Sequence, residues 1–150
     1  MQRLNLSPSL EISRIIYGMW RLDSDQNKST NHINNKINLC LNQGITTFDQ
    51  AAVYGGYGSE ALFGKVIKSN SSLRDKLEIV SKCGIINPSD RYPSVSNSYY
   101  DTSREHLIES VEFSLKNLCT DYLDLLLIHR QDPLMNHFET GDALDALIES

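Results

Sequence analysis

Four side chains that can donate, accept or hold a proton stand at or just after the ends of apolar segments. Asp49 ends one such segment, and Tyr54 follows in a glycine-rich stretch. Lys82 and His129 end two later apolar segments. In a parallel α/β barrel the carboxyl ends of the strands meet at one rim, where the active site forms. The spacing therefore predicts one acid–base site that contains Asp49, Tyr54, Lys82 and His129.

With these residues in this order, the chain resembles the aldo-keto reductases, which are NADPH-dependent carbonyl reductases built on a parallel (β/α)8 barrel of the TIM type. The family's catalytic tetrad is an Asp, a Tyr, a Lys and a His in the order of Asp49, Tyr54, Lys82 and His129. The resemblance runs through essentially the whole chain. It implies that residues 1–150 are the amino-terminal half of such a barrel domain and that the carboxyl-terminal half is absent.

The tetrad suits the reduction of an aldehyde or ketone, which needs a hydride on carbon and a proton on oxygen. A free tyrosine has a pKa of about 10, and a neighbouring ammonium favours its phenolate. By the resemblance, Tyr54 is the proton donor and Lys82 is the neighbouring ammonium. Asp49 is expected to pair with Lys82, and His129 to hydrogen-bond the substrate oxygen.

The resemblance also implies NADPH as the cofactor. Trp20 and Arg21 match the position where the family's backbone approaches the nicotinamide ribose, and Asp49 is a ribose contact in the family. A lone tryptophan is more often part of the core or of a pocket wall, so that alternative stays open. In the family, the other NADPH contacts follow the fifth strand, so most of the cofactor site is expected outside this chain.

Each tetrad residue also has an ordinary structural interpretation. A strand-end Asp or Lys often forms an ion pair, a Tyr beside glycines often packs on a turn, and a His can simply end a strand. Four such residues in barrel order are hard to explain by coincidence. The segment Gly56–Ala61 matches the dinucleotide-binding pattern G-x-G-x-x-A. It stands too far beyond Asp49 for the tight turn of that motif, so we reject that interpretation.

Near-continuous apolar runs predict parallel strands covered on both faces. The strands are expected at Ile15–Trp20, Thr46–Asp49, Leu77–Lys82 and Leu123–His129, after a short hairpin around Ser7-Pro8-Ser9. The order of elements predicts a hairpin followed by about four βα units, which is half of a barrel.

Helical patterns lie between these strands. The first is closed by Gly44, and its asparagines should make it depend on packing. Ser59 is the expected cap of the second helix, and Thr102 with Glu105 forms a capping box for the third. A fourth helix is expected to begin near Thr140. Ile86–Tyr100 is predicted to be a long loop at the rim that shapes substrate access.

The composition is that of an ordinary globular protein, with 150 residues, 40% hydrophobic residues and a net charge of −5. The acidic balance argues against nucleic-acid and anionic-membrane partners. Cys40, Cys83 and Cys119 are far apart, which suits neither a disulfide framework nor a metal site. We expect apolar cysteines in a reducing cytoplasm, with a reactive Cys83 thiol as the alternative. No signal peptide or membrane-spanning run is expected.

A half barrel should hold the tetrad without most of the cofactor site, so we expect this chain alone to be inactive. Three hypotheses remain open. The chain is a reductase whose other half is missing or supplied by another chain, a non-catalytic remnant or interaction module, or a half barrel that dimerises. The open strand edge at Leu123–Ile128 favours self-association. The substrate is expected to be a small carbonyl compound that these residues do not identify.

Overall fold

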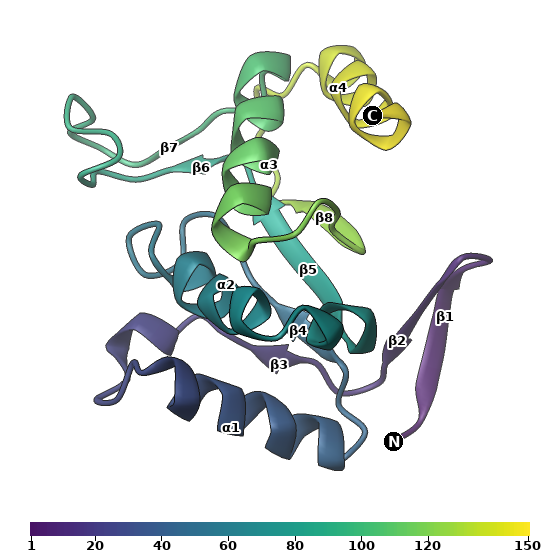
Figure 1. Ribbon diagram of the computed structural model, residues 1–150. Coiled ribbons are helices and arrows are strands. Elements are labelled where there is room, and N and C mark those ends of the chain that lie inside the picture. The colour runs from purple at the N-terminus through teal and green to yellow at the C-terminus, as the bar shows by residue number, and fades with distance from the viewer.

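A four-stranded parallel sheet forms the centre of the chain (Figure 1). The computed structural model describes all residues from Met1 to Ser150. The strands lie in the order β3 (Tyr17–Gly18), β4 (Thr47–Asp49), β5 (Glu78–Cys83) and β8 (Leu125–Ile128), and each pair of neighbours is parallel. The α-helices between and after them are α1 (Thr30–Asn42), α2 (Ser59–Ser69), α3 (Arg104–Leu118) and α4 (His137–Glu149). Successive βα units on a parallel sheet confirm the predicted arrangement.

An antiparallel hairpin, β1 (Arg3–Ser7) and β2 (Leu10–Ser13), stands beside the sheet (Figure 1). Arg3 of this hairpin donates hydrogen bonds to Thr46 Oγ1 at 2.7 Å and to Glu78 Oε1 at 2.9 Å. Glu78 in turn accepts from the hydroxyls of Thr46 and Thr47. Because Thr46, Thr47 and Glu78 lie at the amino ends of β4 and β5, the hairpin is fastened to the end of the sheet opposite the tetrad.

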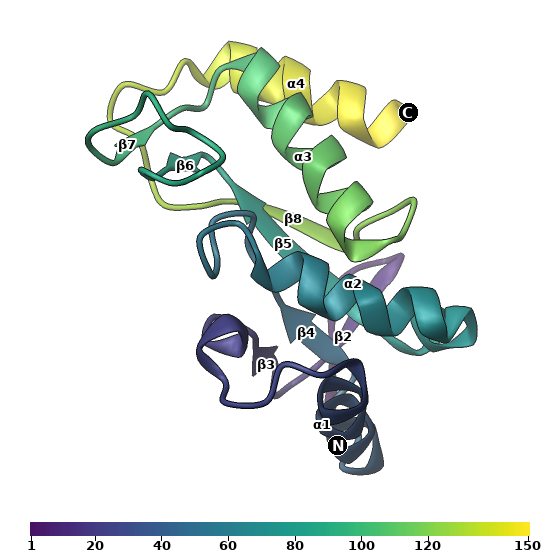
Figure 2. The ribbon, with the colours of Figure 1, turned by 60° about the vertical axis from the view of Figure 1, so that its left-hand side comes forward.

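The main hydrophobic core lies between the sheet and the helices. Strand residues alternate, so that Phe48 and Ile79 face the helices while Asp49, Val80 and Lys82 face the other side. Figure 2 shows α1 and α2 against the same face of the sheet. The core cluster consists of Met19, Leu22, Ile33, Ile37, Cys40, Phe48, Phe63, Val66, Ile67, Leu73, Leu77, Ile79 and Leu118. Because Ile33 and Ile37 are fully buried, the asparagine-rich α1 is anchored by packing, as expected.

The first strand is much shorter than predicted. Within the expected segment Ile15–Trp20, only Tyr17 and Gly18 pair with β4. The hydroxyl of Ser13 donates to the carbonyl oxygen of Ile15 at 2.8 Å, and the backbone N–H of Ser13 donates to Thr47 Oγ1. These side-chain bonds turn the chain from the hairpin into the sheet, so Ile15 and Ile16 stay out of the ladder.

Two helix caps and the start of the fourth helix differ from the predicted positions by one to three residues. The cap of α3 is Ser103, whose Oγ accepts from the backbone N–H of His106, because Asp101 holds the Ser103 hydroxyl at 2.6 Å. Ser59 is the first residue of α2 and gives no cap. The fourth helix begins at His137, capped by the side chain of Asn136.

The expected long loop Ile86–Tyr100 contains a short hairpin at its base. Its strands are β6 (Ile85–Ile86) and β7 (Tyr99–Tyr100), and Ile85 pairs with Tyr100. Figure 1 shows this segment projecting from the sheet beside the upper part of α3. The pairing of β6 with β7 fixes the direction in which the loop leaves the carboxyl end of β5. The polar composition of this segment did not indicate these two strands.

The outer strands β3 and β8 have no neighbour on their far sides, as predicted for the half barrel. A second, smaller core cluster of Cys83, Leu107 and Ala143 packs between β5, α3 and α4, with Leu126 and Ile128 of β8 against it. Leu127, on the opposite face of β8, is 39% exposed. The free edge and this face of β8 are therefore apolar and open.

None of the helices is long and apolar enough to span a membrane.

The contact between α2 and α3 requires a glycine at position 64. A Cβ atom on Gly64 would lie 1.9 Å from the carbonyl oxygen of Asn117, which is a backbone atom that cannot turn aside. We predict that Gly64→Ala lowers the free energy of unfolding by about 3 kcal/mol or more, because overpacking of this kind separates the helices.

The control is Gly141→Ala in α4, where an added Cβ meets no atom within 4 Å. That substitution should raise the free energy of unfolding by about 0.5–1 kcal/mol, because alanine is the better helix former. Denaturant-induced unfolding followed by circular dichroism measures both. Equal effects of the two substitutions would show that the close α2–α3 contact does not exist.

Candidate active site

Backbone pairing between β4 and β5 sets the relative positions of Asp49 and Lys82. Asp49 lies opposite Val80, so Lys82 extends two residues further along the same face of the sheet. The pairing continues past the end of β4: the N–H of Gln50 donates to the carbonyl oxygen of Val80 at 2.8 Å, and that of Ala52 to the carbonyl oxygen of Lys82 at 3.0 Å. The segment that leads to Tyr54 is therefore fixed to β5 by main-chain bonds.

Glycines allow the turn that follows Tyr54. The backbone carbonyl oxygen of Tyr54 accepts from the N–H groups of Gly58 and Ser59, both at 3.2 Å. Gly55 has a φ of +60°, and a Cβ there would lie 2.6 Å from Ser59 Oγ and 2.7 Å from the Asp23 side chain. A side chain at position 55 would therefore be strained as well as crowded, and Tyr54 owes its place to this turn.

The Lys82 ammonium is the centre of the site. Its Nζ lies 2.6 Å from Asp49 Oδ1 and donates to the Tyr54 hydroxyl at 3.0 Å and to the carbonyl oxygen of Gln50 at 2.8 Å. An ammonium carries three donors, and here each has one acceptor. The Lys82 side chain is only 14% exposed, so this full set of partners compensates for the loss of water.

The phenol of Tyr54 has one further partner. Its hydroxyl donates to Asp49 Oδ2 at 3.3 Å, which is long for a bond between two oxygen atoms. The bond is therefore weak, and the phenolic proton can turn to another acceptor at small cost. Lys82, by contrast, holds the phenolic oxygen at a normal hydrogen-bond distance.

His129 follows β8 and completes the group of four. Its backbone N–H donates to the carbonyl oxygen of Cys83 at 2.7 Å, and its ring stands edge-on to Tyr54 with 5.9 Å between ring centroids and an interplanar angle of 81°. Burial lowers the pKa of His129, and the positive charges of Lys82 and Arg130 lower it further. The imidazole is thus neutral at neutral pH. Its Nδ1 is buried and has no hydrogen-bond partner in the protein.

Trp20 and Arg21 lie at the same end of the sheet but form no hydrogen bond or ion pair with the tetrad. The preceding residue, Met19, donates its N–H to the carbonyl oxygen of Asp49 at 2.9 Å, which brings this segment to the end of β4. Trp20 is 63% exposed, and the guanidinium of Arg21 lies 5.4 Å from its ring centroid. An exposed Trp20 excludes the core alternative and leaves the residue open to a ligand.

Sequence reasoning missed two residues at this site, Gln50 and Glu60. The carbonyl oxygen of Gln50 completes the Lys82 set, and a backbone acceptor leaves no signal in the sequence. Glu60 is 1% exposed and accepts from the Ser81 hydroxyl at 2.6 Å on the opposite face of β5. Burial raises the pKa of Glu60. A polar Ser81 inside an apolar strand was the available signal for that contact.

The three cysteines and the possible metal ligands can also be compared with the expectations from the sequence. Cys83 is buried, and burial together with Glu60 raises the pKa of its thiol to about 12. The reactive thiolate is therefore scarce at neutral pH, which argues against the reactive-thiol alternative. Cys40 and Cys119 are also free thiols. No group of three or more His, Cys, Asp or Glu side chains is arranged to hold a metal ion.

We predict that His129 takes up its proton below the ordinary histidine pKa of about 6.5. Because the pKa of His129 is lower in the folded state than in the unfolded state, His129 does not affect the free energy of unfolding above about pH 6.5. The free energy of unfolding falls as the pH drops from about 6.5 towards the folded-state pKa. Lys82→Met should raise the pKa of His129 without restoring the ordinary value, since burial is the larger cause.

Proton NMR of the imidazole signals measures this pKa, with His129→Gln to assign the signal. A His129 that titrates above pH 6.5, or one whose titration ignores Lys82→Met, would contradict the contacts described above.

Comparison with known proteins agrees with this geometry. The family model described as "Aldo/keto reductase family" matches residues 14–150. A 6-dehydroglucose reductase from Agrobacterium fabrum is 55% identical over 150 residues, which are 100% of this chain and 50% of that protein. Oxidoreductase YdhF from Escherichia coli is 46% identical over 151 residues, again 100% of this chain and 50% of the relative. The chain spans about half the length of the curated relatives it matches.

Solved structures show the same relation. The holo form of an aldo-keto reductase from Bacillus halodurans superimposes with a TM-score of 0.81 and 25% sequence identity, and the match covers 99% of this chain and 47% of that one. This likeness confirms the predicted barrel type, of which the chain forms half. With a family model that extends over most of its length, the chain belongs to the aldo/keto reductase family.

Proposed function

We propose that this chain contributes the proton-transfer half of an NADPH-dependent carbonyl reductase, in which Tyr54 is the proton donor. The observation that carries the proposal is the Lys82 ammonium, which holds the phenolic oxygen of Tyr54 at 3.0 Å and is itself held by Asp49. If Asp49 and Lys82 formed only a structural ion pair, the hydroxyl of Tyr54 would not need to bind both of them. A structural tyrosine alone would not need a part-buried ammonium beside its hydroxyl.

The residues of this chain would divide the work as follows. NADPH, when bound, supplies the hydride that the carbonyl carbon receives. Tyr54 gives its proton to the carbonyl oxygen, so that an alcohol forms and a phenolate remains, which later regains a proton from water. Lys82 stabilises that phenolate, and Asp49 keeps Lys82 in place. His129 donates a hydrogen bond to the same oxygen without adding a second positive charge beside Lys82.

The residues present fit one side of the cofactor. Trp20 and Arg21 are exposed at the carboxyl end of β3 and so are accessible to the nicotinamide ribose. Asp49 is 27% exposed, and its two oxygens use one bond each for Lys82 and Tyr54. A carboxylate can accept about four bonds, so it keeps room for a ribose hydroxyl. The remaining contacts would have to come from outside these residues.

The substrate we propose is a small aldehyde or ketone. The relative that is 55% identical is named a 6-dehydroglucose reductase, so 6-dehydroglucose is the first compound to test. The three free thiols suit the cytoplasm, which stays the proposed location.

A non-catalytic role is the second candidate, and one observation favours it. An apolar groove opens between α3, α4 and β8, lined by Ile108, Leu115, Leu125, Leu144 and Leu147. Together with the free edge of β8, this groove suits association with another chain or with a second copy.

We predict that Tyr54→Phe lowers turnover by about 10²–10⁴-fold in a barrel completed with the second half of the Agrobacterium fabrum relative. The ring stays, and only the transferable proton is lost. Lys82→Met should also lower turnover, because the phenolate loses its charged neighbour. The measurement is NADPH oxidation with 6-dehydroglucose and a panel of simple aldehydes.

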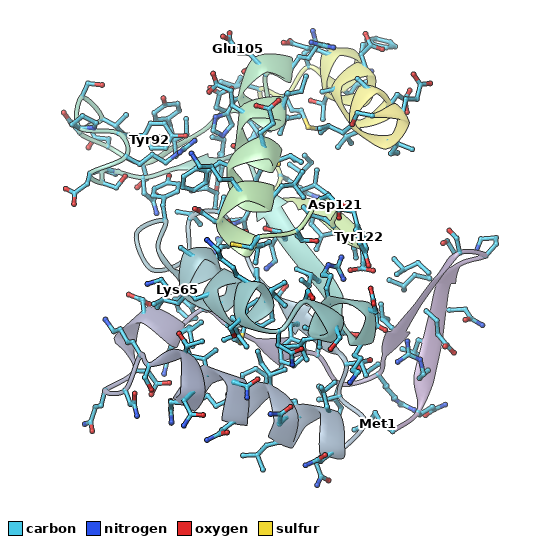
Figure 3. The ribbon with its side chains drawn as sticks, viewed as in Figure 1. Met1, Lys65, Tyr92, Glu105, Asp121 and Tyr122 are labelled. Atoms are coloured by element: carbon cyan, nitrogen blue, oxygen red, sulfur yellow. The ribbon has the colours of Figure 1, made fainter.

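The control is Tyr122→Phe, since Tyr122 is an exposed tyrosine whose ring stacks on Arg74. Figure 3 shows Tyr122 in the turn after α3, away from the projecting β6–β7 segment. Near-normal turnover of Tyr54→Phe would remove Tyr54 from its proposed role.

For the 150-residue chain alone we predict negligible turnover. Alignment of hydride donor and carbonyl can lower a barrier by about 7–11 kcal/mol, and this contribution requires a firmly held cofactor. The assay is the same NADPH oxidation, together with fluorescence titration of NADPH. Robust turnover that disappears in Tyr54→Phe would contradict the prediction and support a half barrel that dimerises into a working site.

We also predict that the chain alone self-associates or keeps a loosened core. The free edge of β8 carries Leu125–Ile128, and Leu127 is 39% exposed. Light scattering coupled to size exclusion, with near-UV circular dichroism, measures both properties. A sharp monomer peak near 17.0 kDa with cooperative melting at several concentrations would rule the prediction out.

A further inference from the structure

Tyr57 has an unfavourable backbone conformation for its residue type. Its φ is +73°, in the left-handed region that L side chains rarely adopt, although three glycines stand in the same turn at positions 55, 56 and 58. Such a conformation persists only where the surroundings hold it. The side chain of Tyr57 is the part that glycine would lack, and the residue is buried, with a relative exposure of 8%.

The Tyr57 hydroxyl binds two residues at the start of the next loop. It accepts from the backbone N–H of Asn87 at 3.0 Å, and it donates a long and therefore weak bond to the carbonyl oxygen of Ile85 at 3.4 Å. Tyr57 comes three residues after Tyr54, whereas Ile85 and Asn87 begin the segment that leaves β5 beyond Lys82. One hydroxyl therefore links the loop after β4 to the loop after β5.

The ring of Tyr57 makes a second connection to the same loop. It stands edge-on to Tyr92 with 5.3 Å between ring centroids, and the guanidinium of Arg91 lies 5.9 Å from its centroid. Arg91 also stacks on Phe113 of α3 at 3.5 Å. Figure 3 shows Tyr92 on the projecting segment beside α3. The tip of the loop is thus held against Tyr57 on one side and α3 on the other.

This aromatic cluster borders the tetrad. Tyr57, Arg91, Tyr92 and Phe113 surround one packed gap, too narrow for a water molecule, together with Lys82 and His129. The cluster therefore lies directly behind the groups that would face the substrate oxygen. A shift of the β6–β7 loop would therefore change the packing beside Lys82 and His129, whereas the three bonds of the Lys82 ammonium go to Asp49, Gln50 and Tyr54 and to none of the loop residues.

We propose that Tyr57 is a positioning residue, which joins the loop of the proton donor to residues 87–98 and so fixes the substrate-side wall of the site. This inference rests on the proposed carbonyl reduction. Its direct consequence concerns substrate binding rather than proton transfer, because the hydroxyl and ring of Tyr57 contact Ile85, Asn87 and Tyr92 and form no hydrogen bond with Tyr54. The left-handed backbone at position 57 is the cost of aiming the side chain at the neighbouring loop.

The first test measures the link itself in the barrel completed with the second half of the Agrobacterium fabrum relative. In Tyr57→Phe the amide of Asn87 loses its acceptor, and its hydrogen exchange should become about five- to tenfold faster. Tyr122→Phe, which removes a hydroxyl from an exposed tyrosine, should leave that amide unchanged. An Asn87 amide without protection in the unaltered barrel, or one that ignores Tyr57→Phe, would overturn the proposal.

The second test separates positioning from simple stability in the completed barrel. Tyr57→Phe should raise the KM for the carbonyl substrate by about five- to tenfold while kcat stays within about twofold and the Kd of NADPH is unchanged. A lower kcat at constant KM, or no change in either constant, would overturn it. If the unaltered barrel reduces no carbonyl compound, the proposed function fails, whereas the exchange of Asn87 still decides whether Tyr57 joins the two loops.

Discussion

A part-buried ammonium needs an acceptor for each of its three N–H bonds, and this requirement organises the carboxyl end of the sheet. Lys82 meets it with a carboxylate, a phenol and a backbone carbonyl, from Asp49, Tyr54 and Gln50. All three acceptors come from one short segment of the chain. Removing any of them would leave a positive charge with too few partners in a place that water reaches poorly, so the segment and the cation fix each other.

The backbone makes that arrangement possible. Main-chain bonds continue from β4 to β5 beyond the last strand residue, so residues 50 to 52 follow the sheet and deliver Tyr54 to the ammonium. Behind Lys82, on the other face of β5, Ser81 binds the buried Glu60 of α2. Two successive residues of β5 are therefore anchored on opposite faces: Lys82 binds Asp49 and Tyr54 on the inner face, and Ser81 attaches the strand to α2 on the outer face.

The sequence was sufficient to predict the parallel βα order and the meeting of Asp49, Tyr54 and Lys82, because strand ends and apolar periodicity are local signals. It failed where two neighbouring residues competed for one role. Thr102 and Ser103 are both good caps, and the choice depends on Asp101, which holds the Ser103 hydroxyl. The carbonyl of Gln50 and the left-handed backbone of Tyr57 were not predictable, since each is set by a partner more than two dozen residues away.

The four members of the tetrad are not held equally well. Asp49, Tyr54 and Lys82 lie on the two central strands or their extensions, and they bind one another. His129 directly follows the edge strand β8, and one main-chain bond to Cys83 holds its backbone. The next residue, Arg130, has a φ of +76° and turns the chain sharply away. Its Nδ1 has no partner in the protein. Because an edge strand is held from one side only, whatever covers the free edge of β8 acts first on His129. The ion pair of Lys82 and Asp49 lies on the next two strands, β5 and β4, each of which is paired on both sides, and it keeps its geometry without that cover.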